Sequence, residues 1–480
     1  MLLGSGRVEV LENGQWLAAL SGGQYEVRRQ GTSTFVHLWS EEHNLVRRVL
    51  RVAEQSAERI VLEVQRFGKA KPGTLEIVSA EAKPSVQRLT REKFCARFHQ
   101  LLAEQFPDEQ IDALTTAADL EHSLSGCFTR GLVHHGQRAW AVLAASAAED
   151  AATLDASLTY GLLWLNRARE HTHGKVLAGL RLFLPEGDTR VTCHRLSALE
   201  PSTHVELYEI NETCWRARPI DPRDIGNLAT WLTPRREIES TLAEARPTIE
   251  KIRALAPEAI TVSVSPGTRD VALRFRGLEF ARWHSGTVSF GLGDERRVLT
   301  PGNRKSLRKL IQRLEGARHP LATNTAHPLY RLQAERWLES VVQVDPKRID
   351  ARIEPEHFYS QVPAFAAGDR GVIDLLGVTR EGRLVVLELK AAEDLHLVLQ
   401  AVDYWLRVRL HRQQDDFRRY GYFAGIELQP KPPLLYLVAP GFRFHPATDV
   451  ILRYLSREVE ITRVGLNETW RRGLQVVFRQ

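Results

Sequence analysis

Two acidic residues and one lysine interrupt apolar runs near the carboxyl end of this 480-residue chain. Asp374 lies within the run of residues 371–378, and Glu388 and Lys390 occupy alternate positions of the run 384–390. Alternate residues of a β-strand project from the same face, so Glu388 and Lys390 are expected side by side. A buried charge is costly unless it is paired or binds a metal. The three residues therefore predict a site for a divalent cation, Mg²⁺ or Mn²⁺.

A hairpin and a helix are the elements that must position these side chains. Residues 371–378 and 384–390 are short, β-branched apolar runs joined by Arg-Glu-Gly. This pattern is typical of a hairpin whose second strand is buried. In the following segment, residues 395–404, the spacing of Gln400 and Tyr404 places both side chains on one face of a helix.

Together these motifs resemble the PD-(D/E)xK nuclease superfamily, whose core is an aspartate on one strand and Glu-x-Lys on the next. Gln400 and Tyr404 match the Q-x-x-x-Y element of its RecB-like branch, and residues 384–400 are similar to NucS-type DNA endonucleases. The segment with Glu335 and Glu339, followed by Asp345 and a proline, is similar to the family's amino-terminal catalytic helix; the distance to that proline favours Glu335. Residues 437–440 are similar to the closing strand, so the resemblance covers about 326–480.

The resemblance implies a metal-dependent DNA endonuclease, with RNA as the alternative substrate. Hydrolysis of a phosphodiester needs an activated water and stabilisation of the charge that grows on the phosphate. The implied metal ligands are Asp374, Glu388 and Glu335, and Lys390 would orient the water or stabilise the phosphate. Gln400 and Tyr404 would position the substrate or brace the site. Taken singly, each motif is more often surface charge; the ordered set favours a site.

Basic residues follow the site and also occur upstream of it. Beyond Tyr404 the chain carries Arg407, Arg409, Arg412, Arg418 and Arg419, and an amphipathic segment near residue 303 carries Arg304, Lys305 and Arg308. We predict phosphate contacts for these residues. A solvated helix surface is the alternative for any single one.

Residues 91–220 resemble a degenerate second copy of the carboxyl-terminal domain. Segments match in the same order, which indicates an internal duplication: 107–113 with 346–351, 146–150 with 390–394, 180–187 with 434–441, and 210–213 with 466–469. In this register Arg130, Ala144, Ser146 and Ala156 replace Asp374, Glu388, Lys390 and Gln400. Without two acidic side chains a hard cation has no site, so this copy is predicted to be inactive.

The expected architecture is mixed α+β (α/β), with tandem restriction-endonuclease-like domains, each preceded by a small β-rich domain. The predicted boundaries are 1–90 for a β-rich domain, 91–220 for the degenerate copy, 221–325 for a helical connector with a second β-rich unit and basic helix, and 326–480 for the nuclease-like domain. A net charge of +6 suits a polyanionic partner.

The remaining expectations concern location and assembly. Four scattered cysteines, the lack of a signal-peptide core and the lack of a membrane-length apolar run indicate a cytoplasmic protein without a membrane partner. NucS-type enzymes act as dimers, so a homodimer or an internal pseudo-dimer is expected. Two alternatives remain open: a ligand-gated defence nuclease acting on DNA or RNA, and a non-catalytic DNA-binding protein.

Overall fold

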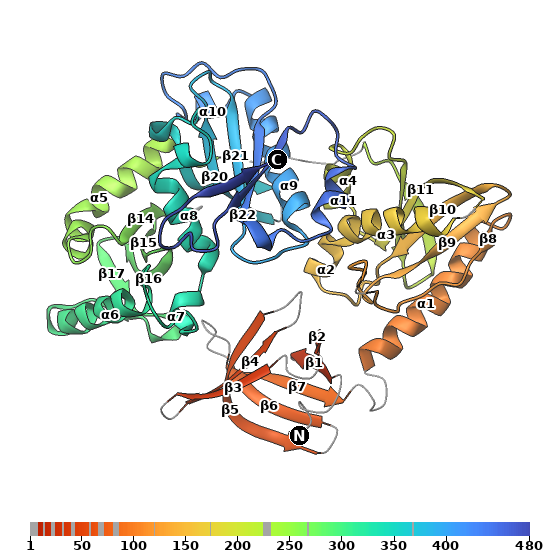
Figure 1. The fold of residues 1–480 in the computed structure, drawn as a ribbon, viewed down its shortest axis with the longest axis horizontal. Helices are drawn as coiled ribbons and strands as arrows, with labels where there is room; N and C mark the ends of the chain where they lie inside the picture. The colour runs from red at the N-terminus through yellow and green to blue at the C-terminus, as the bar shows by residue number, and fades with distance from the viewer. Residues whose placement is uncertain are drawn as a thin grey trace. The chain divides into compact units, whose positions relative to one another are not determined.

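Four β-sheets organise the described part of the chain, which has a mixed α+β fold (Figure 1). The structure is a computed structural model. It describes residues 8–12, 15–20, 25–30, 33–39, 44–56, 59–65, 72–79, 86–119, 121–172, 174–223, 232–265, 268–366 and 369–480. The chain divides into two compact units, Met1–Phe94 with Gly291–Arg297, and Cys95–Phe290 with Val298–Gln480.

The first residues of the chain, where the sequence predicts no secretory leader, lie outside the described ranges. None of the helices within those ranges is long and apolar enough to cross a membrane.

The amino-terminal unit contains a seven-stranded antiparallel sheet, in agreement with the β-rich character predicted for this part of the chain. Val10, Leu38 and Ile77 belong to its apolar core. The strand order is β2-β1-β7-β6-β5-β4-β3. The strands are β1 (Val8–Glu12), β2 (Gln15–Leu20), β3 (Tyr25–Gln30), β4 (Ser33–Trp39), β5 (Asn44–Gln55), β6 (Arg59–Gln65) and β7 (Gly73–Ser79).

A six-stranded sheet follows, in the order β13-β12-β11-β10-β9-β8. Its strands are β8 (Gln110–Ile111), β9 (Thr129–His135), β10 (Arg138–Ala144), β11 (Val176–Pro185), β12 (Val205–Asn211) and β13 (Arg216–Ile220). The helices of this region are α1 (Val86–Gln105), α2 (Ala151–Asp155), α3 (Ser157–His171) and α4 (Arg190–Leu196), and α3 packs against β10 and β11.

The next region combines a long helix, a small antiparallel sheet and the predicted amphipathic helix. Helix α5 spans Arg235–Arg253. The strands are β14 (Ile260–Val264), β15 (Val271–Phe275), β16 (Leu278–His284), β17 (Thr287–Phe290) and β18 (Arg297–Val298). The short helices η2 (Gly293–Glu295) and η3 (Pro301–Asn303) precede α6 (Arg304–Ala317), and α7 (Pro328–Arg331) follows. Leu307, Ile311 and Leu314 on α6 are buried as the apolar spacing predicts.

The carboxyl-terminal region contains a second six-stranded sheet, in the order β19-β20-β21-β22-β23-β24. Its strands are β19 (Tyr359–Ala366), β20 (Asp369–Val378), β21 (Leu384–Leu389), β22 (Leu434–Pro440), β23 (Ile461–Leu466) and β24 (Val476–Arg479). Its helices are α8 (Ala334–Val344), η4 (Pro346–Arg348), η5 (Pro355–His357), α9 (Leu397–Gln413), α10 (Asp416–Arg419), η6 (Gly441–Arg443) and α11 (Thr448–Leu452).

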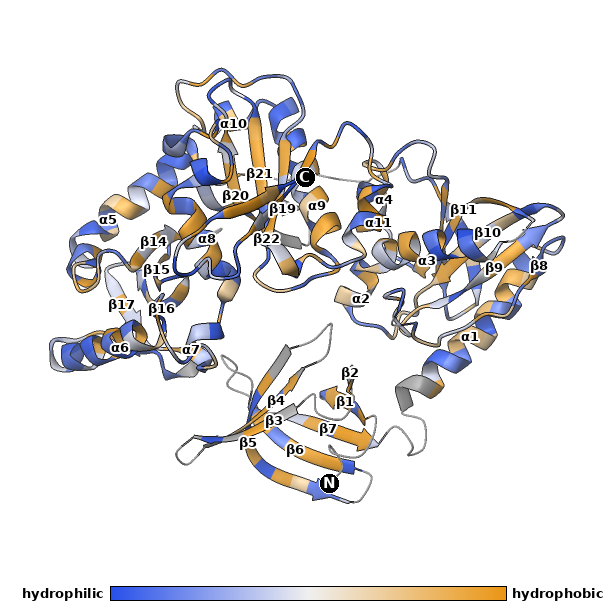
Figure 2. Cartoon of the chain, in the orientation of Figure 1, coloured by the Kyte–Doolittle hydropathy of each residue, from blue (hydrophilic) through white to orange (hydrophobic). Residues whose placement is uncertain are grey.

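The predicted hairpin is confirmed as β20 and β21, which pair antiparallel. Every residue of β21 is buried, and Figure 2 shows the apolar character of β20, β21 and β22. Leu384 and Val386 share one apolar cluster with residues of α9, whereas Val385 and Leu387 share another with residues of α8. The two faces of the sheet are therefore covered by different helices, α9 on one face and α8 on the other.

Candidate active site

Asp374 and Glu388 lie at the same level of the β20–β21 hairpin. The ladder between these strands pairs Leu375 with Leu387, and the next level brings Asp374 beside Glu388. The two carboxyl groups lie close enough to affect each other's pKa, and the backbone N–H of Leu389 donates to Asp374 Oδ2 at 3.3 Å. Glu388 alternates with Val386, so both carboxyls belong to the face of the sheet that α9 covers.

The carboxyl group of Glu388 is buried without full compensation. Glu388 is 4% exposed, and its Oε2 atom has no hydrogen-bond partner among the described residues. Burial and the neighbouring Asp374 raise the pKa of Glu388 well above its ordinary value. Burial also raises the pKa of Asp374, although Arg336 opposes this effect. A buried Glu388 with one unpartnered oxygen, beside the half-buried Asp374, forms a site that a cation would stabilise.

Lys390 lies directly beyond the end of β21, where its backbone N–H donates to the carbonyl of Val438 at 3.0 Å. Its Nζ atom is 3.9 Å from Glu388 Oε1 and 2.9 Å from Asp394 Oδ2. Desolvation acts to lower the pKa of Lys390, but Asp394, Glu335 and Glu388 raise it above its ordinary value. Lys390 is therefore held as a cation beside the carboxyl pair.

Helix α8 brings two glutamates toward Asp374, and their surroundings differ. Glu335 is exposed, yet desolvation by the neighbouring protein is the main cause that raises its pKa. Lys390 lowers the pKa of Glu335, and Asp374 raises it. Glu339 is 6% exposed, and burial raises its pKa to about 7. Since Glu335 is the one that also influences Glu388 and Lys390, it is the better placed of the two for chemistry.

Two further residues contact this group of acids, and neither belongs to the predicted site. Arg336 Nη1 lies 2.8 Å from Glu339 Oε2 and 3.7 Å from Asp374 Oδ1. Gln361 Nε2 donates to Glu339 Oε2 at 3.1 Å. Gln361 has a φ of 54°, an uncommon conformation for a residue other than glycine. A glutamine within a strand-like, largely apolar segment was the signal that could have identified it.

Helix α9 presents Gln400 and Tyr404 as the Q-x-x-x-Y spacing predicts. Desolvation, followed by the charges of Glu388 and Asp374, raises the pKa of Tyr404. The hydroxyl group of Tyr404 is therefore close enough to both carboxyl groups for their charges to act on it. Gln400 Oε1 is buried and has no hydrogen-bond partner among the residues described. The structure thus brings five of the predicted site residues close enough for their charges to affect one another's pKa: Asp374, Glu388, Lys390, Glu335 and Tyr404.

The basic residues beyond Tyr404 have contacts within the protein. The guanidinium of Arg407 lies 6.0 Å from the centre of the Tyr404 ring, and Arg409 pairs with Glu458 at 3.2 Å. Arg412 donates to the carbonyls of residues 428 and 429 at 2.6 and 3.1 Å, so it braces a loop.

Arg418 and Arg419 lie on α10, farther along the chain. Arg418 pairs with Asp415 at 2.8 Å and Arg419 with Asp416 at 3.0 Å. A role of these arginines in nucleic-acid binding stays a prediction.

The donor set fits a hard cation through two carboxylates. Within the described part of the chain, no group of three or more histidine, cysteine, aspartate or glutamate side chains is arranged to hold a metal ion. Mg²⁺, however, is commonly bound by one or two carboxylates together with waters and substrate oxygens. Asp374 and the unpartnered oxygen of Glu388 provide such a pair, and Glu335 as a third ligand stays a prediction.

The sequence has no match among protein-family models and no significant match among curated proteins.

Proposed function

We propose that this chain is a Mg²⁺- or Mn²⁺-dependent DNA endonuclease with one site, formed by Asp374, Glu388 and Lys390. The observation that supports it most strongly is the buried Glu388 carboxyl with an unpartnered oxygen, beside the half-buried Asp374 and a lysine held as a cation. Most buried carboxylate oxygens have a hydrogen-bond partner, so an unpartnered one needs an explanation. A cation bound by both acids would satisfy this oxygen.

Each side chain has a role that follows from its position. Asp374 and Glu388 would hold the cation, which lowers the pKa of a coordinated water and offsets phosphate charge. Lys390 Nζ would donate a hydrogen bond to a non-bridging phosphate oxygen, where negative charge grows during attack. Glu335 is exposed and would accept a proton from the attacking water. Tyr404 would orient the substrate from α9.

The two six-stranded sheets support the proposal of an internal duplication. In each sheet the first two pairings from β8 or β19 are antiparallel, the next two are parallel and the last is antiparallel. The backbone N–H of Ala145 donates to the carbonyl of Phe183 at 3.0 Å, as that of Lys390 donates to Val438. Ala145 is therefore the counterpart of Lys390 under this proposal.

The strand pairing shifts part of the sequence-based register by one residue. Two positions before Ala145 is Leu143, which pairs with Arg130 as Glu388 lies beside Asp374. The counterparts are thus Leu143 and Ala145 rather than Ala144 and Ser146, because the residue count between matched segments differs. Arg130 is 4% exposed and donates to the carbonyls of Ser125 and Ala117. Because Arg130, Leu143 and Ala145 provide neither an acid nor a lysine, we propose that this copy has no cleavage site.

A pairing between the two copies supports an internal pseudo-dimer. Leu199 forms an antiparallel bridge with Leu455, and each precedes the next strand, β12 or β23, by the same number of residues. In a two-fold symmetric dimer, equivalent residues meet in this way at the symmetry axis. We infer that the degenerate copy occupies the place of a second subunit.

A substrate panel tests the proposed function. Purified protein would be incubated with supercoiled, linear, single-stranded and branched DNA and with RNA, with Mg²⁺, Mn²⁺ or a chelator. We expect metal-dependent cutting of DNA that the chelator abolishes. Cutting of RNA alone would replace DNA as the substrate, and absence of cutting with retained DNA binding would leave a binding protein.

A further inference from the structure

The outer face of α6 is basic and exposed over the length of the helix. Arg304, Lys305, Arg308, Lys309 and Arg313 are all exposed, whereas Leu307, Ile311 and Leu314 on the opposite face are buried. The helix has 14 residues and is therefore about 21 Å long. Its exposed positions form a continuous stripe because they recur every three to four residues.

Within the described residues, no ion pair neutralises the charges of this stripe. No ion pair joins any of the basic residues of α6 named above to an acid in the described part of the chain. The one acid among the exposed positions of α6, Glu315, acts on Arg276, whose pKa it raises against the stronger effect of burial. The stripe is thus a concentrated positive surface that attracts a polyanion.

The arginines beyond Tyr404 offer a contrast. Arg409, Arg418 and Arg419 pair with acids, and Arg412 donates to backbone carbonyls. Their charge is largely offset locally, so the cluster is a weaker electrostatic attractor than α6. Of the two basic regions that the sequence indicates, α6 is the one whose basic side chains form no ion pair with an acid among the described residues.

The carboxyl end of α6 is fixed to the candidate catalytic helix α8. Arg318 follows α6, is 0% exposed, and donates to the carbonyls of Leu329, Leu332 and Arg276 at 2.5 to 2.7 Å. Arg276 in turn donates to the carbonyl of Arg318 at 2.6 Å. The Arg318 guanidinium lies 4.7 Å from the centre of the Trp337 ring of α8. A polyanion bound along α6 would therefore be held at a set distance from Asp374.

We propose that the basic face of α6 binds the phosphate backbone of duplex DNA and anchors it for cleavage at the site of Asp374, Glu388 and Lys390. The proposal rests on the proposed function for the identity of the substrate. Duplex DNA carries one negative charge per about 1.7 Å of its axis with both strands counted, about twice the charge density of one strand. This density favours the duplex over a single strand.

The salt dependence of binding tests this surface. Duplex DNA binding would be measured between about 50 and 200 mM salt in a chelator, which prevents cleavage. The test variant combines Arg304→Gln, Arg308→Gln and Lys309→Gln. The control combines Arg236→Gln, Arg246→Gln and Lys251→Gln on α5, which removes the same charge from exposed positions of another helix. Glutamine preserves helix propensity, and circular dichroism would confirm folding.

The two variants should behave differently. Removing one cation that neutralises a phosphate lowers the slope of log K against log[salt] by about 0.9. The α6 variant should therefore show a slope smaller by about 2 to 3 and bind at least about tenfold more weakly. The α5 control should keep the wild-type slope, because under this proposal its three residues contact no phosphate.

Other outcomes would overturn the proposal, and they separate it from the proposed function. An equal reduction of the slope in both variants would show that net charge alone matters. An α6 variant that binds and cuts DNA as the wild type does would reject the surface while the nuclease stands. A reduced slope confined to duplex RNA would reject the DNA assignment. Wild-type protein that neither binds nor cuts DNA would remove both proposals.

Discussion

At the scale of single residues, the proposed metal site depends most on Glu388. Its carboxyl is buried next to Asp374, and one oxygen has no partner among the described residues. Such a group destabilises a protein that lacks a compensating cation, because its desolvation is not offset. The same feature becomes stabilising when a cation binds. The stability of the protein should therefore report on the metal site independently of cleavage.

We predict that Glu388→Gln separates these two effects. Without metal, the unfolding free energy of the variant should equal that of the wild type or exceed it by up to about 1–3 kcal/mol. Its unfolding temperature should accordingly be equal or higher. Mn²⁺ or Mg²⁺ should stabilise the wild type, since a ligand that binds only the folded state raises its stability. The variant should gain little. Thermal unfolding with and without metal measures both effects.

Glu427→Gln, at an exposed position, is the matched control and should respond to metal like the wild type. If Mn²⁺ stabilised Glu388→Gln as much as the wild type, the cation would bind elsewhere.

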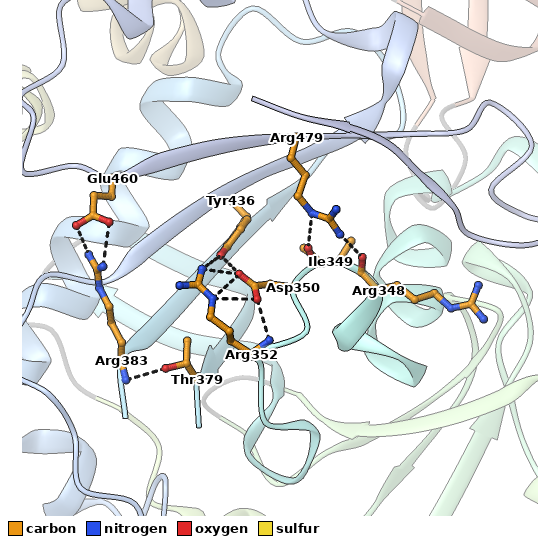
Figure 3. A network of polar contacts seen from close by, with 9 residues as sticks. All are labelled: Arg348, Ile349, Asp350, Arg352, Thr379, Arg383, Tyr436, Glu460 and Arg479. Atoms are coloured by element: carbon orange, nitrogen blue, oxygen red, sulfur yellow. Dashed lines mark hydrogen bonds and ion pairs between the residues drawn. The ribbon is translucent and has the colours of Figure 1, made fainter. Parts of the chain in front are cut away.

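Asp350 gives a prediction about pH, and Figure 3 shows its network. It accepts hydrogen bonds from the Arg352 guanidinium at 2.6 Å and from the Tyr436 hydroxyl at 2.5 Å. Burial alone would raise its pKa, but these hydrogen bonds lower the pKa of Asp350 to about 2. A lowered folded-state pKa contributes stability that is present above the unfolded value, about 3.9, and is lost as pH falls toward 2.

Asp350→Asn should therefore destabilise the protein by about 1–2 kcal/mol at pH 7. The difference from the wild type should shrink between about pH 4 and pH 2. Urea unfolding across this range measures it, with exposed Asp108→Asn as the control. A difference that stayed constant down to pH 2 would show that the charge of Asp350 is not what stabilises the fold.

At the scale of elements, α9 joins the candidate site to the region that contains the sheet β8–β13. Arg195, next to the end of α4, is 5% exposed and contacts both carboxylate oxygens of Asp403 at 2.9 and 2.7 Å. Asp403 lies beside Tyr404 on α9. The two sheets also share one apolar cluster, which includes Leu182 and Leu435. The region of α4 and the sheet β8–β13 therefore braces α9, the helix that carries Gln400 and Tyr404.

A double-mutant cycle on Arg195→Ala and Asp403→Ala should measure this brace. Each single substitution should destabilise the protein, because it removes the charge partner of the buried Arg195 or of the half-buried Asp403, and the double variant should cost clearly less than the sum. The more exposed pair of Arg409, on α9, and Glu458 should couple by at most about 1 kcal/mol. Additive costs at Arg195 and Asp403 would contradict a coupling through this ion pair.

The sequence predicted those parts of the site that depend on local patterns. The alternation of apolar residues is a local signal, and it placed Asp374 and Glu388 in a buried hairpin. The role of Gln361 depends on a φ of 54° in β19 and on the distant Glu339, which no local pattern encodes. Similarly, Arg412 and Arg308 look alike in sequence, yet within the described ranges it is Arg412 that donates to a carbonyl of a following loop.

At the scale of the whole molecule, the two six-stranded sheets form the proposed pseudo-dimer. Only the sheet β19–β24 carries the proposed site, so the pseudo-dimer has one site. A protein with a single site cuts one strand per binding event. We predict that supercoiled DNA is converted first to nicked circles, and that linear product arises later from independent events. Gel analysis over time, at concentrations where light scattering shows a monomer, measures this. Linear product without a nicked intermediate would contradict the single site.

The cleavage rate of Lys390→Ala tests the central claim most directly. Single-turnover cutting of duplex DNA with Mg²⁺ or Mn²⁺ would be compared between the wild type, this variant and Lys347→Ala, an exposed lysine near the end of α8. We predict that the cleavage rate of Lys390→Ala falls by at least about 10²-fold at a temperature where circular dichroism shows the variant folded, and that Lys347→Ala cuts like the wild type. Cutting by Lys390→Ala at the wild-type rate would contradict the proposed site.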